Sequence, residues 1–178
     1  MTDCTKSLYQ GRIIRVGLET VTLPDGRVLE LESVRHPGGA AVAAVDAEGR
    51  VCLVRQYRHA GGGWLWELPA GKIDNREDPM LTAQRELLEE AGVDAREWSP
   101  LGSLHSSPGV FDEVIHLFLA MSLVQGEQRL EADELLEVHW LPLEQALEWA
   151  ADGRISDAKS IIGLFRAANV LGANAGNG

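Results

Sequence analysis

Apolar and polar positions alternate through the first part of the chain, and this alternation predicts β-strands. Over residues 11–34 β-branched and aliphatic side chains lead into the turn Pro24-Asp25-Gly26 and resume after it, which is typical of a strand–turn–strand unit. The segment His36-Pro37-Gly38-Gly39 then interrupts the pattern. We therefore expect residues 1–38 to form a small N-terminal β segment set apart from the main domain.

The rest of the chain mixes short apolar runs with stretches of helical periodicity. The runs predicted as strands are residues 40–45, 51–57, 64–68, 101–104, 114–121 and 135–140. The segments predicted as helices are residues 79–91, 142–151 and 157–171. Because these elements interleave without a regular βαβ rhythm, we expect an α/β (α+β) fold in which a mixed sheet packs between helices over residues 39–171. We expect residues 172–178 to form a disordered tail.

Composition narrows the class of protein. The 178 residues include 16 basic and 27 acidic ones, a net charge of -11, which argues against nonspecific nucleic-acid binding. Cys4 and Cys52 are too few for a disulfide framework or a four-ligand zinc site. No apolar run is long enough to span a membrane and no secretory signal is recognisable, so we expect a cytoplasmic protein. If such an acidic protein handles an anionic substrate, divalent cations or a local basic cluster must offset the repulsion.

The predicted helix over residues 79–91 concentrates acidic side chains. In helical projection Glu86, Glu89 and Glu90 lie within about 100° of one another. The apolar residues expected to be buried on the other side are Met80, Leu81, Leu87, Leu88 and Ala91. Carboxylates at this spacing repel one another unless a cation lies between them, and an all-oxygen ligand set favours Mg²⁺ or Mn²⁺ over zinc. The alternative interpretation is a solvated acidic face.

The residues around this helix favour the metal site. The fixed positions that match the pattern G-x5-E-x7-R-E-U-x-E-E-x-G-U are Gly71, Glu77, Arg85, Glu86, Glu89, Glu90 and Gly92, with Leu87 and Val93 at the apolar positions U. Such a match arises by chance in about one chain in 10⁶ of this length. The pattern is the Nudix box, and the sequence resembles the Nudix hydrolases over about residues 11–171. The resemblance implies an α/β/α sandwich that hydrolyses a nucleoside diphosphate linked to another moiety.

The resemblance also implies roles for single residues. Glu86 and Glu90 would be metal ligands, Glu89 a ligand or an acid–base residue, and the Ala70 carbonyl would complete a site for Mg²⁺, or for Mn²⁺. The positions of the box expected to be structural are Gly71, Glu77, Arg85 and Gly92, with Arg85 holding the acidic cluster and Glu77 pairing with it.

Features outside the box resemble the ADP-ribose pyrophosphatase branch. They are Gln56-Tyr57-Arg58, the entry Glu67-Leu68-Pro69-Ala70-Gly71 into the box, and Pro108, fifteen residues after Val93. In that branch the catalytic base lies in an acidic loop before a late strand, and here that loop is residues 131–134. The resemblance therefore implies Glu134 as the base, with Glu137 at the start of the following strand as the second choice. The residues expected at the substrate are Arg58 on a phosphate, Glu113 near the terminal ribose, and Pro108. The alternatives are that the acidic run is only a solvated loop and that Arg58 is only a surface arginine at the end of a strand.

These features together indicate a Mg²⁺-dependent hydrolase that splits ADP-ribose into AMP and ribose 5-phosphate. Two alternatives stay open: hydrolysis of another nucleoside diphosphate sugar such as GDP-mannose, and a non-catalytic nucleotide-binding regulatory module. The branch resemblance implies a homodimer formed through the N-terminal segment, and we expect neither a nucleic acid nor a membrane as partner.

Overall fold

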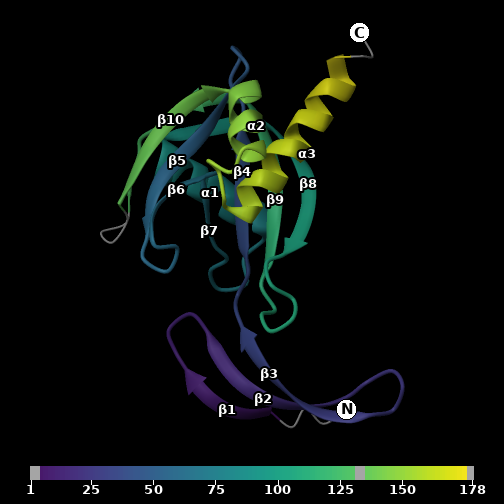
Figure 1. Ribbon diagram of the computed structural model, residues 1–178. Helices are drawn as coiled ribbons and strands as arrows, with labels where there is room; N and C mark the ends of the chain where they lie inside the picture. Colours follow the sequence, from purple (N-terminus) through teal and green to yellow (C-terminus); the bar gives the residue numbers. More distant parts are fainter. Residues whose placement is uncertain (1–4, 131–134, 176–178) are drawn as a thin grey trace.

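The computed structural model describes residues 5–130 and 135–175 and contains three sheets and three helices (Figure 1). The strands are β1 (Thr5–Gln10), β2 (Arg15–Thr22), β3 (Val28–Arg35), β4 (Gly39–Ala44), β5 (Arg50–Arg58), β6 (Gly63–Glu67), β7 (Ala70–Lys72), β8 (Val93–His105), β9 (Val114–Gln125) and β10 (Leu136–Pro142). The helices are α1 (Pro79–Ala91), α2 (Leu143–Ala151) and α3 (Ala158–Ala175). No helix in this described part is long and apolar enough to cross a bilayer.

The central sheet has the strand order β7-β4-β9-β8, with β4 parallel to β9 and the other pairs antiparallel, which confirms the predicted mixed sheet. Strand β4 is buried on both faces and supplies two hydrophobic clusters. Ala41 contributes to a cluster with Leu164 of α3, and Val42 to a cluster with Leu87 of α1. The sheet therefore lies between α1 on one side and α2 with α3 on the other, as an α/β/α sandwich.

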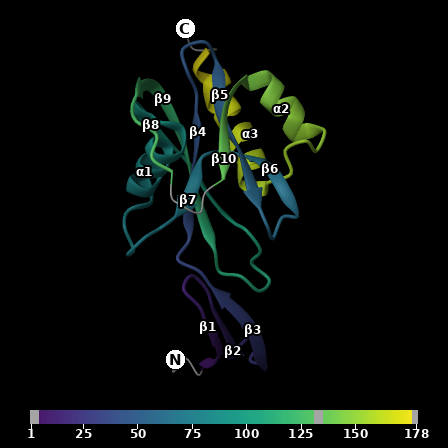
Figure 2. The ribbon, with the colours of Figure 1, turned by 90° about the vertical axis from the view of Figure 1, so that its left-hand side faces the viewer.

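A second antiparallel sheet, β10-β5-β6, lies beside the central one (Figure 2). Cys52 of β5 is fully buried in the cluster beneath α1. Burial, together with the negative charge of Glu90, raises the pKa of the Cys52 thiol to about 12. This face of β5 is thus directed toward α1, and that orientation positions the residues discussed below.

The N-terminal strands form a separate three-stranded sheet, β1-β2-β3, that extends away from the body (Figures 1 and 2). The predicted strand–turn–strand unit is β2 and β3, and β1 adds a strand that the hydrophobic pattern did not predict. Glu19 is buried and accepts hydrogen bonds from Ser33 and Arg35, which lower its pKa. Arg35 also pairs with Asp112 at 3.1 Å and so ties this sheet to the loop before β9.

Helix α1 has the predicted bounds, and the prediction of its buried face is correct for Leu87, which is buried, and for Met80 and Ala91, which pack against the same cluster, but not for the rest. The Asp78 side chain caps its start, and Gly92 ends it in the left-handed conformation at φ 66°. Glu86 and Glu90 are buried, however, whereas Leu81 and Leu88 are exposed. Glu86 lines a polar pocket beside β4 and β7, and Glu90 accepts a hydrogen bond from the Ala70 amide of β7.

The lengths of three other elements differ from the predictions. Strand β8 begins at Val93, eight residues earlier than predicted, and pairs with β9 through a bulge between Pro100 and Gly102. Strand β7 was not predicted because three residues carry no recognisable pattern. Helix α3 continues to Ala175, so the first part of the expected disordered tail is helical. A single glycine at position 172 costs about 1 kcal/mol and does not end a helix whose earlier turns are anchored in the core.

Candidate active site

A pocket of about 580 Å³ opens between the two sheets of the body. Strand β5, strand β7, helix α1 and the first turn of α3 all contribute side chains to its lining. Its lining includes Arg58, Ala70, Gly71, Glu86 and Glu113, which the sequence analysis selected as site residues. These five positions, far apart along the chain, are therefore brought to one place.

The loop glycine of the box allows the Glu86 carboxylate to approach the backbone. A Cβ atom built on Gly71 would lie 1.9 Å from Glu86 Oε1, so no other residue fits without moving that carboxylate. On the next turn of α1, Glu90 accepts a hydrogen bond of 2.9 Å from the Ala70 amide. The two buried carboxylates thus hold the Ala70–Gly71 backbone against the helix.

Arg85 binds the acidic groups around the pocket. Its guanidinium lies 2.7 Å from Glu86, 3.1 Å from Glu89 and 3.1 Å from Glu77. Partial burial opposes the charge on Arg85, but hydrogen bonds to Glu77 and its other acidic neighbours outweigh this and raise its pKa. Glu77 also accepts a hydrogen bond from Thr82, which together with Arg85 lowers the Glu77 pKa. This contact pattern is the one expected for residues that hold the cluster in place.

The donor set fits a hard divalent cation. Glu86, Glu90 and the Ala70 carbonyl are oxygen donors from adjacent elements, and oxygen-only sites suit Mg²⁺. Within the described residues no three His, Cys, Asp or Glu side chains already form a metal-holding cluster. The Glu89 side chain is about one-third exposed and is held by Arg85, on the rim of the site and not in its lining.

A cationic wall of the pocket was only partly predicted. Arg58 donates two hydrogen bonds of 2.9 Å to Glu67, which is 2% exposed. Lys159, in the first turn of α3, contacts the same carboxylate at 2.5 Å and Asp157 at 3.0 Å. Burial raises the Glu67 pKa, but the hydrogen bonds and charges of Arg58 and Lys159 outweigh it and lower the pKa overall. One buried anion therefore holds both Arg58 and Lys159 at the pocket.

The structure places the other substrate and base candidates in different surroundings. Glu113 lies in the pocket, 3.2 Å from His36 Nδ1. Pro108 is exposed in the loop before β9 and does not line the pocket. Glu137 lies opposite Arg55 across the β10–β5 pair and forms an ion pair with it at 3.7 Å, also outside the pocket. Glu134 lies outside the described residues.

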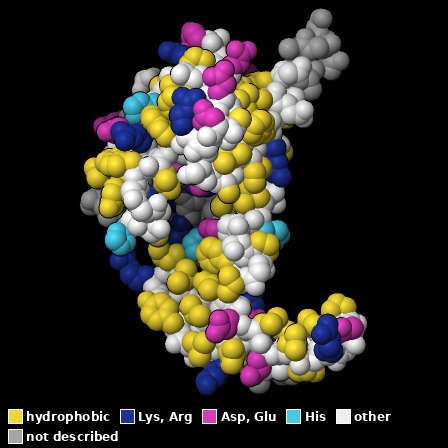
Figure 3. Space-filling model, in the orientation of Figure 1, with side chains coloured by type: hydrophobic (Ala, Val, Ile, Leu, Met, Phe, Trp, Pro, Cys, Tyr) yellow, Lys and Arg dark blue, Asp and Glu magenta, His cyan; other side chains and the backbone are white. Residues whose placement is uncertain are grey.

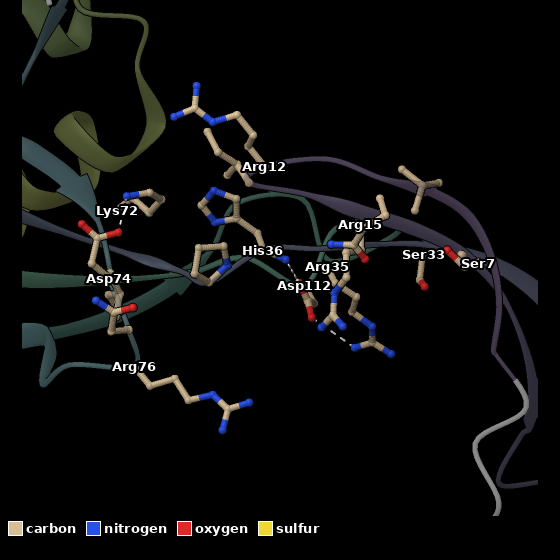
Figure 4. Close-up of a pocket in the computed structure, with 17 residues that line it drawn as sticks. Ser7, Arg12, Arg15, Ser33, Arg35, His36, Lys72, Asp74, Arg76 and Asp112 are labelled. Atoms are coloured by element: carbon tan, nitrogen blue, oxygen red, sulfur yellow. Dashed lines mark hydrogen bonds and ion pairs between the residues drawn. The ribbon is translucent and has the colours of Figure 1, made fainter. Parts of the chain in front are cut away.

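A larger cavity of about 890 Å³ adjoins this pocket where the N-terminal sheet meets the body, and the space-filling view shows the surface hollowed there (Figure 3). Its charged lining consists of Arg12, Arg15, Arg35, Lys72, Arg76, Asp74 and Asp112. In Figure 4, Lys72 and Arg76 lie at one end and the strand residues Ser7 and Ser33 at the other, with His36 between them. Five cations against two carboxylates make this cavity basic in a protein of net charge -11. A local basic cluster of this kind is what an acidic protein would need in order to bind an anionic ligand.

Comparison with known proteins identifies the family. The sequence profile of the NUDIX domain matches residues 35–162. The chain belongs to the Nudix family. It is 38% identical over 162 residues to a methanol dehydrogenase activator of Bacillus methanolicus, covering 90% of this chain and 88% of that protein. It is 37% identical over 161 residues to an ADP-ribose pyrophosphatase of Bacillus subtilis (strain 168), covering 89% and 87%.

A solved structure described as an ADP compounds hydrolase has the same fold. It superposes with a TM-score of 0.82 at 22% identity and covers 97% of this chain and 95% of its own. That similarity extends over the N-terminal sheet as well as the Nudix domain.

Three polar residues of this Nudix site were missed by sequence reasoning. Lys159 and Asp157 form an ion-pair group with the buried Glu67. Ser160 links the group to the chain by donating to Asp157 and accepting from the Leu68 amide. Glu67 was noted only as part of the entry into the box. Its burial could not be read from the sequence, because its two partners are nine residues before it and 92 residues after it.

Proposed function

We propose that this Nudix protein hydrolyses ADP-ribose to AMP and ribose 5-phosphate with Mg²⁺. The observation that carries the proposal is one pocket that combines the carboxylate Glu86 with the cations Arg58 and Lys159. A pyrophosphate needs charge neutralisation at its oxygens, and this lining offers both cationic side chains and ligands for a divalent cation. The 37% identity to an ADP-ribose pyrophosphatase supports the same substrate.

The metal would be held by Glu86, Glu90 and the Ala70 carbonyl, with Glu89 at the rim. When bound, it would neutralise charge on the pyrophosphate and lower the pKa of a coordinated water. Gly71 and Arg85 position the Glu86 carboxylate for the metal. Gly71 has no Cβ that would clash with it, and Arg85 forms an ion pair with it.

Arg58 binds a substrate phosphate in this proposal. Its two hydrogen bonds to Glu67 fix the guanidinium, so little side-chain entropy is lost when the phosphate arrives. Glu113 accepts hydrogen bonds from the terminal ribose, and the adjoining basic cavity accommodates the nucleotide half. Glu134 is the base that takes the proton of the attacking water. The outward contacts of Glu137 favour Glu134 over it.

We further propose that residues 1–38 form a segment through which two copies associate. Support comes from apolar side chains left exposed on the N-terminal sheet and the adjoining turn, namely Leu8, Tyr9, Ile13, Val28, Leu29 and Leu31. Three strands with so much apolar surface in water are only marginally stable by themselves. Light scattering coupled to gel filtration should give about twice the monomer mass of 19.4 kDa. A monomer would refute this part of the proposal without touching the chemistry.

A substrate panel tests the activity. The panel contains ADP-ribose, GDP-mannose, ADP-glucose, diadenosine polyphosphates and 8-oxo-dGTP, each with Mg²⁺ and with EDTA. We expect kcat/KM for ADP-ribose to exceed the others at least tenfold, as about 1.4 kcal/mol of extra transition-state binding would give. If kcat/KM is highest for GDP-mannose, the metal-dependent hydrolysis stands but ADP-ribose is not the preferred substrate. No turnover of any compound would favour a regulatory module, the role that the name of the Bacillus methanolicus relative suggests.

A further inference from the structure

One polar side chain of the pocket has no role in the account above. Gln56 of β5 is 5% exposed and lies in the pocket lining. Its amide oxygen is shielded from solvent and accepts no hydrogen bond from any described residue. A buried amide oxygen without a donor destabilises the free protein, whereas Met or Leu would fill the same space without that cost.

The position of Gln56 points to the chemistry of the missing donor. Along β5 its side chain shares a face with Cys52 and Arg58, because side chains two and four residues apart point the same way. The pocket that Gln56 lines also includes Arg58, the proposed phosphate-binding residue, and Ala70 and Glu86, which the proposal assigns to the metal. A group that enters this pocket with the substrate or the metal therefore arrives close to Gln56.

We propose that the Gln56 amide oxygen accepts a hydrogen bond from an O–H group that arrives with the bound substrate and metal. This inference rests on the proposed function. The O–H group is either a water held by the metal or a hydroxyl of the substrate sugar, and both offer the donor that no described residue supplies. Rotation about the terminal torsion of glutamine, which is broad and roughly two-fold, turns the oxygen toward the pocket.

The test uses Gln56→Met, which keeps the length and removes both polar atoms, and Gln145→Met on α2 as the matched control outside the pocket. We expect Gln56→Met to reduce kcat/KM for ADP-ribose five- to tenfold, because one hydrogen bond is lost and the O–H group that donated it is left unpaired. The Tm of the free variant should equal that of the wild type or exceed it by up to about 3 °C. Gln145→Met should leave kcat/KM within twofold.

Two binding measurements identify the donor. If it is metal-held water, Gln56→Met weakens the binding of Mn²⁺ alone, measured by electron paramagnetic resonance. If it is a sugar hydroxyl, Mn²⁺ binding is unchanged and only the α,β-methylene analogue of ADP-ribose binds more weakly by calorimetry. Unchanged binding of both, or a Tm several degrees below wild type, would overturn the inference. A wild-type protein that neither binds nor hydrolyses ADP-ribose would instead refute the proposed function.

Discussion

The Gly71→Ala substitution tests whether the close approach of helix and loop positions the Glu86 carboxylate. The new Cβ would lie 1.9 Å from Glu86 Oε1, 2.0 Å from its carboxyl carbon and 2.5 Å from Oε2. Ordinary contact begins at 3.4 Å, so Oε1 must move by about 1.5 Å. The clash is with the end of a flexible side chain, and we therefore expect the fold to survive.

The displacement should affect activity far more than stability. A shift of this size at a reacting centre costs about 10²-fold in kcat. Stability should fall by only about 1 kcal/mol, because the Arg85–Glu86 contact at 2.7 Å is weakened and the helix otherwise stays packed. Urea unfolding and steady-state kinetics measure the two quantities. Gly172→Ala, where an added Cβ meets nothing within 4 Å, is the matched control: it should leave kcat unchanged and raise stability by up to about 1 kcal/mol, because it removes a glycine from a helix.

A double-mutant cycle isolates the cause. In a Glu86→Ala background the clashing carboxylate is gone, so adding Gly71→Ala should cost no further stability. If Gly71→Ala alone keeps wild-type kcat, or if it destabilises both backgrounds equally, Gly71 is not there to make room for Glu86.

Four more substitutions probe the site. Glu90→Gln should abolish metal-dependent turnover. Its Tm, measured by calorimetry, should stay within a few degrees of wild type, because the amide oxygen can still accept the hydrogen bond from the Ala70 amide. Turnover at the wild-type rate would refute the role of Glu90 as a metal ligand. Glu134→Gln should lower kcat at least 10²-fold with little change in KM. The kcat of Glu137→Gln, on the outward face, should stay within threefold of wild type in the same assay. If Glu137→Gln lowers kcat and Glu134→Gln does not, Glu137 is the base. Glu67→Gln should cost about 2 kcal/mol at pH 7, because the partly exposed Arg58 and the partly buried Lys159 both lose their charged hydrogen-bond partner. The Glu67 pKa is lowered in the folded state, so its contribution is full above the usual value of 4.5 and lost as pH falls through the folded pKa. The loss of unfolding free energy in Glu67→Gln, measured by urea unfolding, should therefore shrink as the pH falls below 4.5. A loss that does not change with pH would contradict the ion-pair explanation.

The sequence predicted α1 and the strands of the core because these elements carry their signals locally. Pro79 at the first turn and Gly92 after the last one define the helix from neighbouring residues alone. The buried face of α1 was predicted only in part, because hydrophobic periodicity assumes that carboxylates avoid the interior. Here Glu86 and Glu90 are buried because Arg85 and the Ala70 amide satisfy them, and the pocket that they serve arises from tertiary structure.

The rest of the site depends on contacts between distant parts of the chain. The box spacing located Gly71 and Glu86, but the partnership of Glu67 with Lys159 joins β6 to α3 across 92 residues. The basic cavity likewise forms only when the N-terminal sheet meets the loop around Lys72 and Arg76. Such groupings have no fixed spacing, so neither periodicity nor a short motif could predict them.

Product analysis tests the central claim most directly. ADP-ribose is incubated with the protein and Mg²⁺, and the products are separated by ion-exchange chromatography and identified by ³¹P NMR. We expect AMP and ribose 5-phosphate in equal amounts, with no product when EDTA is added. Unchanged ADP-ribose under these conditions, or release of ADP and free ribose, would contradict hydrolysis of the pyrophosphate at this site.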